Sequence, residues 1–297
     1  PLEPPVGRSG RQETVRQAFS IDAINEFDPL IDDIYDFCEA QEISVDNLIH
    51  ESGAAQLEIN FMHGDPLDLA DQVFLFKRIV REAAMRRNIY STFMAKPMKN
   101  EPGSALHMHV SVVDEKTGKN IFSDEQGEDS AVFRSYIAGL QRYIPEATML
   151  FAPYVNSYRR FMGMLSSPIN VQWGYDNRTV GLRVPRSEPE ARRVENRVPG
   201  ADANPYLAFA ATLAAGYLGM KQHLSPSEPV EGSAYNLPHS LPREVSEAAA
   251  LLRGSAGMRE MLGDRFIDVY CEMKEEEYQE FFQVISAWER EYLLLNV

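Results

Sequence analysis

Residues 191–198 read ARRVENRV, a pattern in which charged side chains alternate with other residues. On an extended chain, Arg193, Glu195 and Arg197 share one face, while Val194 and Val198 point to the other. A period of two predicts a β-strand. Its charged face needs partners, because an unpaired ion in a desolvated groove costs several kcal/mol. Taken alone, the triplet is best explained as a ladder of ion pairs on a solvated sheet edge.

The same alternation recurs in three other short runs, residues 56–61, 106–112 and 179–184. Each run carries polar or charged side chains at every second position and apolar side chains between them. We therefore expect further strands, each with one polar face.

Helical spacing dominates between and after these runs. Asp28 is a candidate N-cap with Pro29 at the first helical position, and Asp65 with Pro66 repeats the pattern. Residues 223–243 are rich in Pro and Ser and predict a surface loop, whereas residues 244–296 predict nearly continuous helix. The predicted fold class is α+β, with helices packed around a curved antiparallel sheet.

The first residues show no periodicity. Residues 1–13 hold three prolines and two glycines, which predicts a loop. We assign residues 1–19 to a loop that leads into the domain and residues 20–297 to one domain.

Composition narrows the classes of function. The chain has 297 residues and a net charge of -15, which disfavours binding to nucleic acid. No apolar run approaches the roughly 20 residues that span a bilayer, and Cys38 and Cys271 lack the spacing of a zinc or disulfide motif. We therefore expect a soluble protein of the cytoplasm with small-molecule substrates. Only seven basic residues are lysine, a balance that suits concentrated salt and raises the hypothesis of a salt-adapted source.

Two pairs of side chains could bind a metal ion. Glu51 and Glu58 lie seven residues apart, and residues 53–55 between them are small enough for a tight bend. Converging carboxylates suit Mg²⁺ or Mn²⁺. His107 and His109 share a strand face, and a neutral imidazole could complete such a site. Surface acids and hydrogen-bonded structural histidines remain the alternative for each pair in isolation.

The order of five motifs is more specific than any one of them. Together they closely resemble the catalytic core of glutamine synthetases, from about residue 20 to the end. The motifs are the metal-binding segment at residues 51–58, KP at 96–97 with GSALHMHVS at 103–111, NSYRR at 156–160 with NR at 177–178, ARRVENR at 191–197 with ANPYL at 203–207, and AYNLP at 234–238.

The resemblance implies a role for each matching residue, with ATP and glutamate entering a funnel from opposite ends. Metal ions, Mg²⁺ or Mn²⁺, sit at its waist, where their charge assists phosphoryl transfer. The implied metal ligands are Glu51 and Glu58 for one ion, and His107 and Glu195 for the other. The implied nucleotide side comprises His109, Ser111, Arg178, Arg183 and Arg193, with Arg178 also catalytic. The implied glutamate side comprises Gly103, Arg160 and Arg197, with Arg160 also catalytic.

The implied reaction has two steps. The γ-carboxylate of glutamate attacks ATP to give γ-glutamyl phosphate, and an amine then displaces phosphate. Two departures from the family pattern stand out: Glu190 replaces a basic residue near the nucleotide, and Tyr235 occupies the place of a regulatory tyrosine but with different flanking residues.

Family members also have a small N-terminal β-grasp domain and a first catalytic strand with two further glutamate ligands. Neither precedes Pro1, so we expect this chain to be part of a longer protein. The resemblance further implies a homo-oligomeric ring, in which one subunit closes the site of the next.

Ser166 is the third implied catalytic residue, and it bears on the choice of amine. Ammonia-using members carry a glutamate two residues before the proline at this point, here Pro168. Serine offers neither a charge for ammonium nor a base for its proton, and it leaves more room. Among similar proteins with this change, the activity most often implied is γ-glutamylation of a polyamine such as putrescine, within polyamine catabolism and nitrogen metabolism, and we predict it here. Ethanolamine and other monoamines are alternative acceptors. An ammonia-dependent glutamine synthetase is the first alternative and a non-catalytic structural homologue the second. A guanidino kinase is disfavoured because its phosphagen motifs are absent.

Overall fold

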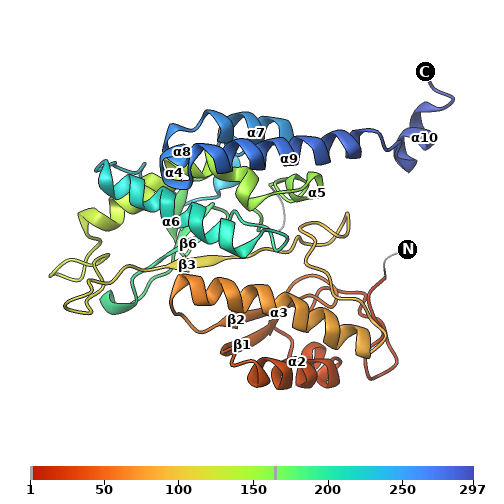
Figure 1. Ribbon diagram of the computed structural model, residues 1–297. Helices are drawn as coiled ribbons and strands as arrows, with labels where there is room; N and C mark the ends of the chain where they lie inside the picture. The colour runs from red at the N-terminus through yellow and green to blue at the C-terminus, as the bar shows by residue number, and fades with distance from the viewer. Residues whose placement is uncertain (1–2, 164–165) are drawn as a thin grey trace.

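The computed structural model describes residues 3–163 and 166–297. The N-terminal part forms a small layer of three helices and a hairpin, seen in the red-to-orange lower half of Figure 1. Its elements are α1 (Ile21–Asn25), α2 (Asp28–Ala40), β1 (Val45–His50), β2 (Leu57–Phe61) and α3 (Pro66–Arg86). The two strands are antiparallel, and His50 pairs with Leu57 next to the turn. Residues such as Ile34, Cys38 and Phe76 form a small core between the helices and the hairpin.

The second sheet carries three residues of the predicted site, His109, Arg183 and Glu195. Its strands are β3 (Met108–Val110), β4 (Trp173–Tyr175), β5 (Leu182–Val184) and β6 (Val194–Asn196), in the spatial order β3-β6-β5-β4. β6 is antiparallel to both β3 and β5, whereas β4 and β5 are parallel. The centre of β6 is therefore flanked by a strand on each side.

Helices cover this sheet and form the upper half of Figure 1. They are α4 (Ala131–Phe151), α5 (Val155–Tyr158), α6 (Pro205–Lys221), α7 (Val245–Gly254), α8 (Ala256–Leu262), α9 (Asp264–Phe282) and α10 (Ala287–Leu293), with 3₁₀ turns at Pro189–Ala191 and Ala234–Asn236. Helices α4 and α6 pack so closely that a Cβ atom on Gly139 would lie 2.2 Å from the carbonyl oxygen of Ala215. Glycine is required at that crossing, which anchors the main core.

Most sequence expectations for the fold are confirmed. The four predicted strands exist, and the helical C-terminal region follows the loop at residues 223–243. Asp65 caps α3 by accepting from the amides of Leu67 and Asp68. The expectation for Asp28 was wrong by one residue, because α2 begins at Asp28 and Phe27 occupies the cap position.

Six helices and strands were not predicted, namely α1, β1, α4, α5, β4 and α6. Helix α6 buries residues around most of its circumference, so it lacks the one-sided pattern that identifies a surface helix. Cys38 and Cys271 are buried free thiols. Among the described residues, none of the helices combines the length and the apolar character needed to cross a bilayer.

Candidate active site

Glu195 lies at the centre of β6 and is the residue on which the site converges. Its register partners are His109 on β3 and Arg183 on β5. The side chain is only 2% exposed. Arg183 Nη1 donates to Oε2 at 2.8 Å, Arg197 Nη1 donates to Oε1 at 2.5 Å, and His107 Nδ1 lies 3.2 Å from Oε1.

These neighbours keep Glu195 ionised. Burial alone would raise the pKa of its carboxyl, but His107, Arg197, His109 and Arg183 together lower the pKa to about 2. The pKa of His107 is lowered by burial and then by the charge of Arg197. A neutral imidazole next to a carboxylate is a suitable pair of donors for a divalent cation.

Glu51 and Glu58 stand on either side of the β1–β2 turn. Glu51 directly follows β1, and Glu58 lies on β2, where Asn60 Nδ2 donates to its Oε1 at 3.1 Å. Burial raises the pKa of Glu58, and the negative charges of Glu51 and Glu195 raise it further. The three carboxylates are therefore close enough to repel one another, and a bound cation would relieve that repulsion.

The predicted metal ligands are thus brought together as two pairs, Glu51 with Glu58 and His107 with Glu195. Within residues 3–163 and 166–297, no group of three His, Cys, Asp or Glu side chains is clustered closely enough to form a complete metal site. The donor chemistry fits Mg²⁺ or Mn²⁺, while the remaining ligands would have to come from elsewhere.

The predicted nucleotide side is more open. Arg193 Nε donates to His109 Nδ1 at 3.3 Å, where His109 is exposed and Arg193 is half-buried. Arg183 also donates to Asp176 Oδ1 at 3.2 Å, so its guanidinium bridges two carboxylates. Arg178 and Ser111 are exposed, and the described residues give neither a side-chain contact with the Glu195 group.

The predicted glutamate side is tightly packed around Arg160, which is 3% exposed. Its Nη1 and Nη2 atoms donate to the carbonyl oxygens of Val198 and Arg197 at 2.7 and 2.8 Å. Burial and then the charge of Arg197 lower the pKa of Arg160 to about 10. A Cβ atom on Gly103 would lie 2.6 Å from the Ala95 carbonyl oxygen and 3.0 Å from Arg160 Cγ, so only glycine fits beside this arginine.

Ser166 lies next to this side in the left-handed region, with φ at 65°. Its side chain is exposed, and its carbonyl oxygen accepts from Arg197 Nη2 at 3.4 Å. Met164 and Leu165 of the same segment lie outside the described residues. Tyr235 is close by, because a Cβ atom on Gly163 would lie 3.8 Å from its Cδ1. Burial raises the pKa of Tyr235, while Arg197 and Arg160 oppose that rise.

Two residues of the site were not assigned a role from sequence. Gln56 Nε2 donates to the Gly103 carbonyl oxygen at 3.1 Å and so links the hairpin to the glutamate side. Asp176, at a φ of 46°, holds Arg183 from the turn after β4. The alternation of Gln56 with Glu58 indicates that Gln56 lies on the same strand face as that ligand. Nothing in the local sequence indicates a role for Asp176.

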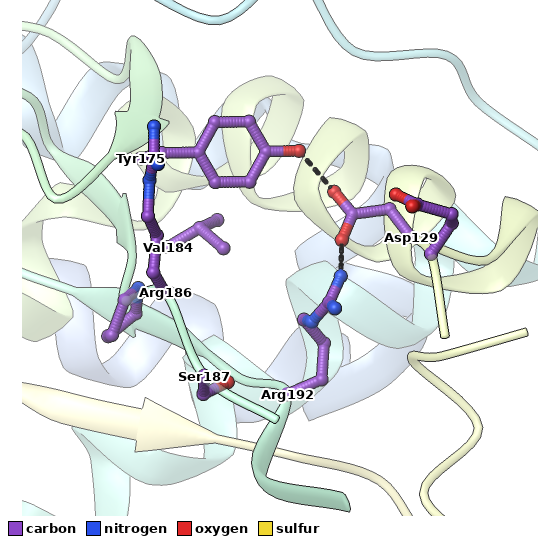
Figure 2. Close-up of a pocket in the computed structure, with 8 residues that line it drawn as sticks. Asp129, Tyr175, Val184, Arg186, Ser187 and Arg192 are labelled. Atoms are coloured by element: carbon purple, nitrogen blue, oxygen red, sulfur yellow. Dashed lines mark hydrogen bonds and ion pairs between the residues drawn. The ribbon is translucent and has the colours of Figure 1, made fainter. Parts of the chain in front are cut away.

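A hollow of about 260 Å³ lies beside the site. Figure 2 shows Asp129 between Tyr175 and Arg192 in its lining. Tyr175 Oη donates to Asp129 Oδ2 at 2.5 Å, and Arg192 forms an ion pair with the other carboxylate oxygen. None of the residues predicted to act on substrates lines this hollow. Its contacts join Arg192 to the loop that precedes α4.

A family model and individual known proteins assign this chain to the same family. Residues 2–293 match the family described as "Glutamine synthetase, catalytic domain". The chain is 37% identical over 299 residues to γ-glutamylputrescine synthetase PuuA of Escherichia coli (strain K12), covering 99% of this chain and 63% of that protein. It is also 37% identical over 260 residues to type-1 glutamine synthetase 2 of Dictyostelium discoideum, covering 85% and 50%.

A solved structure described as "GmaS/ADP complex-Conformation 1" superposes with a TM-score of 0.85 at 28% identity, covering 95% of this chain and 67% of that one. The chain therefore spans about half to two thirds of the length of these relatives.

Proposed function

Because this chain belongs to the glutamine synthetase family, we propose that the whole protein uses ATP to join the γ-carboxylate of glutamate to an amine, and that this amine is a polyamine such as putrescine. Enzymes of this family use ATP and divalent metals. The fold class expected from sequence is that of the family's catalytic domain.

One observation carries the proposal. Glu195 is 2% exposed and is held by Arg183 at 2.8 Å and Arg197 at 2.5 Å, with His107 at 3.2 Å. A non-catalytic structural homologue has no need of a buried carboxylate in contact with two arginines and a histidine, because apolar side chains of similar volume are often as stable. The arrangement suits a site that handles a metal ion and highly charged substrates.

The proposed roles follow the geometry. A divalent ion held by Glu195 and His107, with a second on Glu51 and Glu58, would neutralise charge on the transferred phosphoryl group. Arg193 and His109 face the nucleotide side, where Arg178, Arg183 and Ser111 are further candidates. Guanidinium groups suit phosphate oxygens because they present paired donors.

Arg160 and Arg197 are proposed to hold glutamate, with the backbone of Gly103 against it. The γ-carboxylate oxygen then attacks the terminal phosphorus of ATP, and ADP leaves. The amine nitrogen next attacks the γ-carbonyl carbon, loses a proton, and displaces phosphate. Positioning and charge are the main contributions of the protein.

Ser166 supports an amine larger than ammonia. It is exposed beside Arg197 and carries no charge that would attract ammonium. The name of the E. coli relative specifies putrescine, whereas that of the Dictyostelium relative specifies glutamine synthesis at the same identity. Ammonia-dependent glutamine synthesis is therefore the second candidate function.

The test is a panel of acceptors given to the whole protein with glutamate and MgATP. Phosphate release and the mass of the γ-glutamyl product would be measured with putrescine, longer polyamines, ethanolamine and ammonium. We expect the highest kcat/KM with a diamine or polyamine. Equal or better turnover of ammonium would replace the proposal with ordinary glutamine synthesis, and absence of phosphate release with every amine would remove the enzymatic function.

A further inference from the structure

Glu13 belongs to none of the groups described above, yet its carboxylate is almost fully buried, with 6% of the side chain exposed. Its Oε2 accepts from the backbone amide of Ala55 at 2.8 Å and lies 3.0 Å from His50 Nε2. Its Oε1 is buried and has no hydrogen-bond partner among the described residues. Burying a carboxylate costs free energy, and the contacts with Ala55 and His50 offset only part of that cost. A buried carboxylate of this kind calls for an explanation of what it holds in place.

The two partners of Glu13 lie at opposite ends of the β1–β2 turn. His50 is the last residue of β1, is fully buried, and directly precedes Glu51. The Glu51 carbonyl oxygen and the Glu13 carboxylate can only accept, so both ring nitrogens of His50 are donors, Nδ1 to Glu51 at 2.7 Å and Nε2 to Glu13 at 3.0 Å. Glu13 therefore acts on the backbone of Glu51 through the imidazole ring.

Ala55 is the other end of the turn, and it adopts a φ of 52°, a conformation that residues other than glycine rarely take. Such a conformation persists only when its surroundings hold it. The hydrogen bond from its amide to Glu13 is one such restraint. The turn is also closed by the Glu51 amide, which donates to the Gln56 carbonyl oxygen at 2.8 Å.

The shape of this turn sets where Glu51 and Glu58 stand, because one residue directly precedes it and the other lies on the strand that follows. Glu58 pairs with Ile49 in the hairpin register, so a shift of the turn would move both carboxylates. Gln56 then links the same turn to Gly103 on the glutamate side, at 3.1 Å.

We propose that Glu13 is a positioning residue, whose carboxylate clamps His50 and the Ala55 amide and so fixes the separation of Glu51 and Glu58 for a divalent cation. This inference rests on the proposed function only in taking Glu51 and Glu58 as cation ligands. Residues that orient the ligands of a metal commonly affect its affinity by about 10- to 100-fold.

A purely structural role would be to fasten the N-terminal segment, and Glu26 provides the matched control for that. Its carboxylate accepts from the amide of Ser9 at 2.9 Å and so ties the same segment to the end of α1 without contacting the turn. Glu26→Ala should therefore loosen the segment but leave the hairpin unchanged.

The experiment titrates Mn²⁺ into the whole protein, and free Mn²⁺ is followed by electron paramagnetic resonance. Glu13→Ala should weaken binding by about 10- to 100-fold. Glu13→Gln should weaken it less, because the amide oxygen can still accept from Ala55, and Glu26→Ala should match the wild type. Hydrogen exchange of the peptide at residues 51–60 should accelerate in the same order, which reports on the turn without metal.

An unchanged Mn²⁺ affinity in Glu13→Ala, or an equal loss in Glu26→Ala, would overturn the inference. If Glu13→Ala does not fold, Glu13→Gln decides: wild-type affinity with wild-type exchange overturns the inference, and weaker affinity with faster exchange supports it. A wild-type protein that binds no Mn²⁺ would instead defeat the proposed function, so the two failures are distinguishable.

Discussion

Arg183 on β5 and Glu195 on β6 face each other in register, and Nη1 of the arginine lies 2.8 Å from Oε2 of the glutamate. With Arg197 on the other oxygen, Glu195 has two charge-assisted partners in a buried place. Removing one member of such a group leaves buried charge unpaired, at a cost of roughly 3–5 kcal/mol. Glu195 therefore matters for stability as well as for chemistry.

The first prediction separates those two contributions. Glu195→Gln should lower phosphate release by more than about 100-fold, the upper end for residues that merely orient a metal ligand. It should also lower the free energy of unfolding. Phosphate release and urea unfolding of the same preparations provide the measurement.

Asp129→Asn is the control for Glu195→Gln, because Asp129 is also a largely buried carboxylate in an ion pair, at 10% exposure with Arg192 at 13%. It should lose stability but keep phosphate release. If both variants lost activity to the same extent, the role of Glu195 would be structural alone.

The second prediction concerns Arg160, which is proposed to hold the carboxylate of glutamate. Arg160→Lys keeps the charge but cannot donate to both Val198 and Arg197 while also binding substrate. A charge-assisted contact contributes about 1.5–3 kcal/mol, so the KM for glutamate should rise roughly 10- to 100-fold. The KM for ATP should stay near that of the wild type, and an unchanged KM for glutamate in steady-state kinetics would contradict the assignment.

Whether the sequence predicts a structural feature depends on how far apart in the chain the residues that form it lie. Glu195 could be identified because alternation in one strand marks its face, and the hydrogen-bonded register then brings His109 and Arg183 to it. Glu13 could not, since it lies 37 residues from His50 in a segment without periodicity. The parallel pairing of β4 with β5 was equally hidden, because alternation does not encode strand direction.

Helices show the same limit. α3 was predicted because Asp65 caps it and one face is apolar, and both features are local. α6 is apolar on most sides because it is buried between α4 and α3. Its pattern therefore depends on neighbours that lie far away in the chain.

The third prediction is a pH dependence outside the proposed metal ligands. Lys77 on α3 donates to the Ala203 carbonyl oxygen at 2.8 Å, and burial lowers the pKa of its ammonium from 10.5 to about 8. Between those two values the unfolded chain holds the proton and the folded chain does not. Stability contributed by this group should therefore rise as pH increases through that window.

Relative to Lys77→Met, the wild type should gain at most about 3 kcal/mol in the free energy of unfolding between pH 8 and pH 10.5. Urea unfolding of both proteins across this range measures the difference. Lys221 offers the opposite case, because its ion pair with Glu260 raises its pKa. The advantage of the wild type over Lys221→Met should not rise with pH, and a flat difference for Lys77→Met would show that Lys77 is not desolvated.

The last prediction concerns the amine, and it depends on charge rather than on size at position 166. Ser166 has a φ of 65°, so glutamate and glutamine would be accommodated there with equal backbone strain. Ser166→Glu adds a carboxylate next to Arg197, which should attract ammonium and accept its proton, and the longer side chain should obstruct an alkyl chain. Ser166→Gln adds the same bulk without the charge.

We expect both variants to lose kcat/KM for putrescine, and only Ser166→Glu to gain kcat/KM for ammonium. When putrescine and ammonium compete, mass spectrometry measures the ratio of γ-glutamylputrescine to glutamine. In Ser166→Glu this ratio should shift toward glutamine, because kcat/KM for ammonium rises. If Ser166→Gln gained ammonium activity to the same extent, volume would control the choice of amine, and if neither variant changed the ratio, Ser166 would not contact the acceptor.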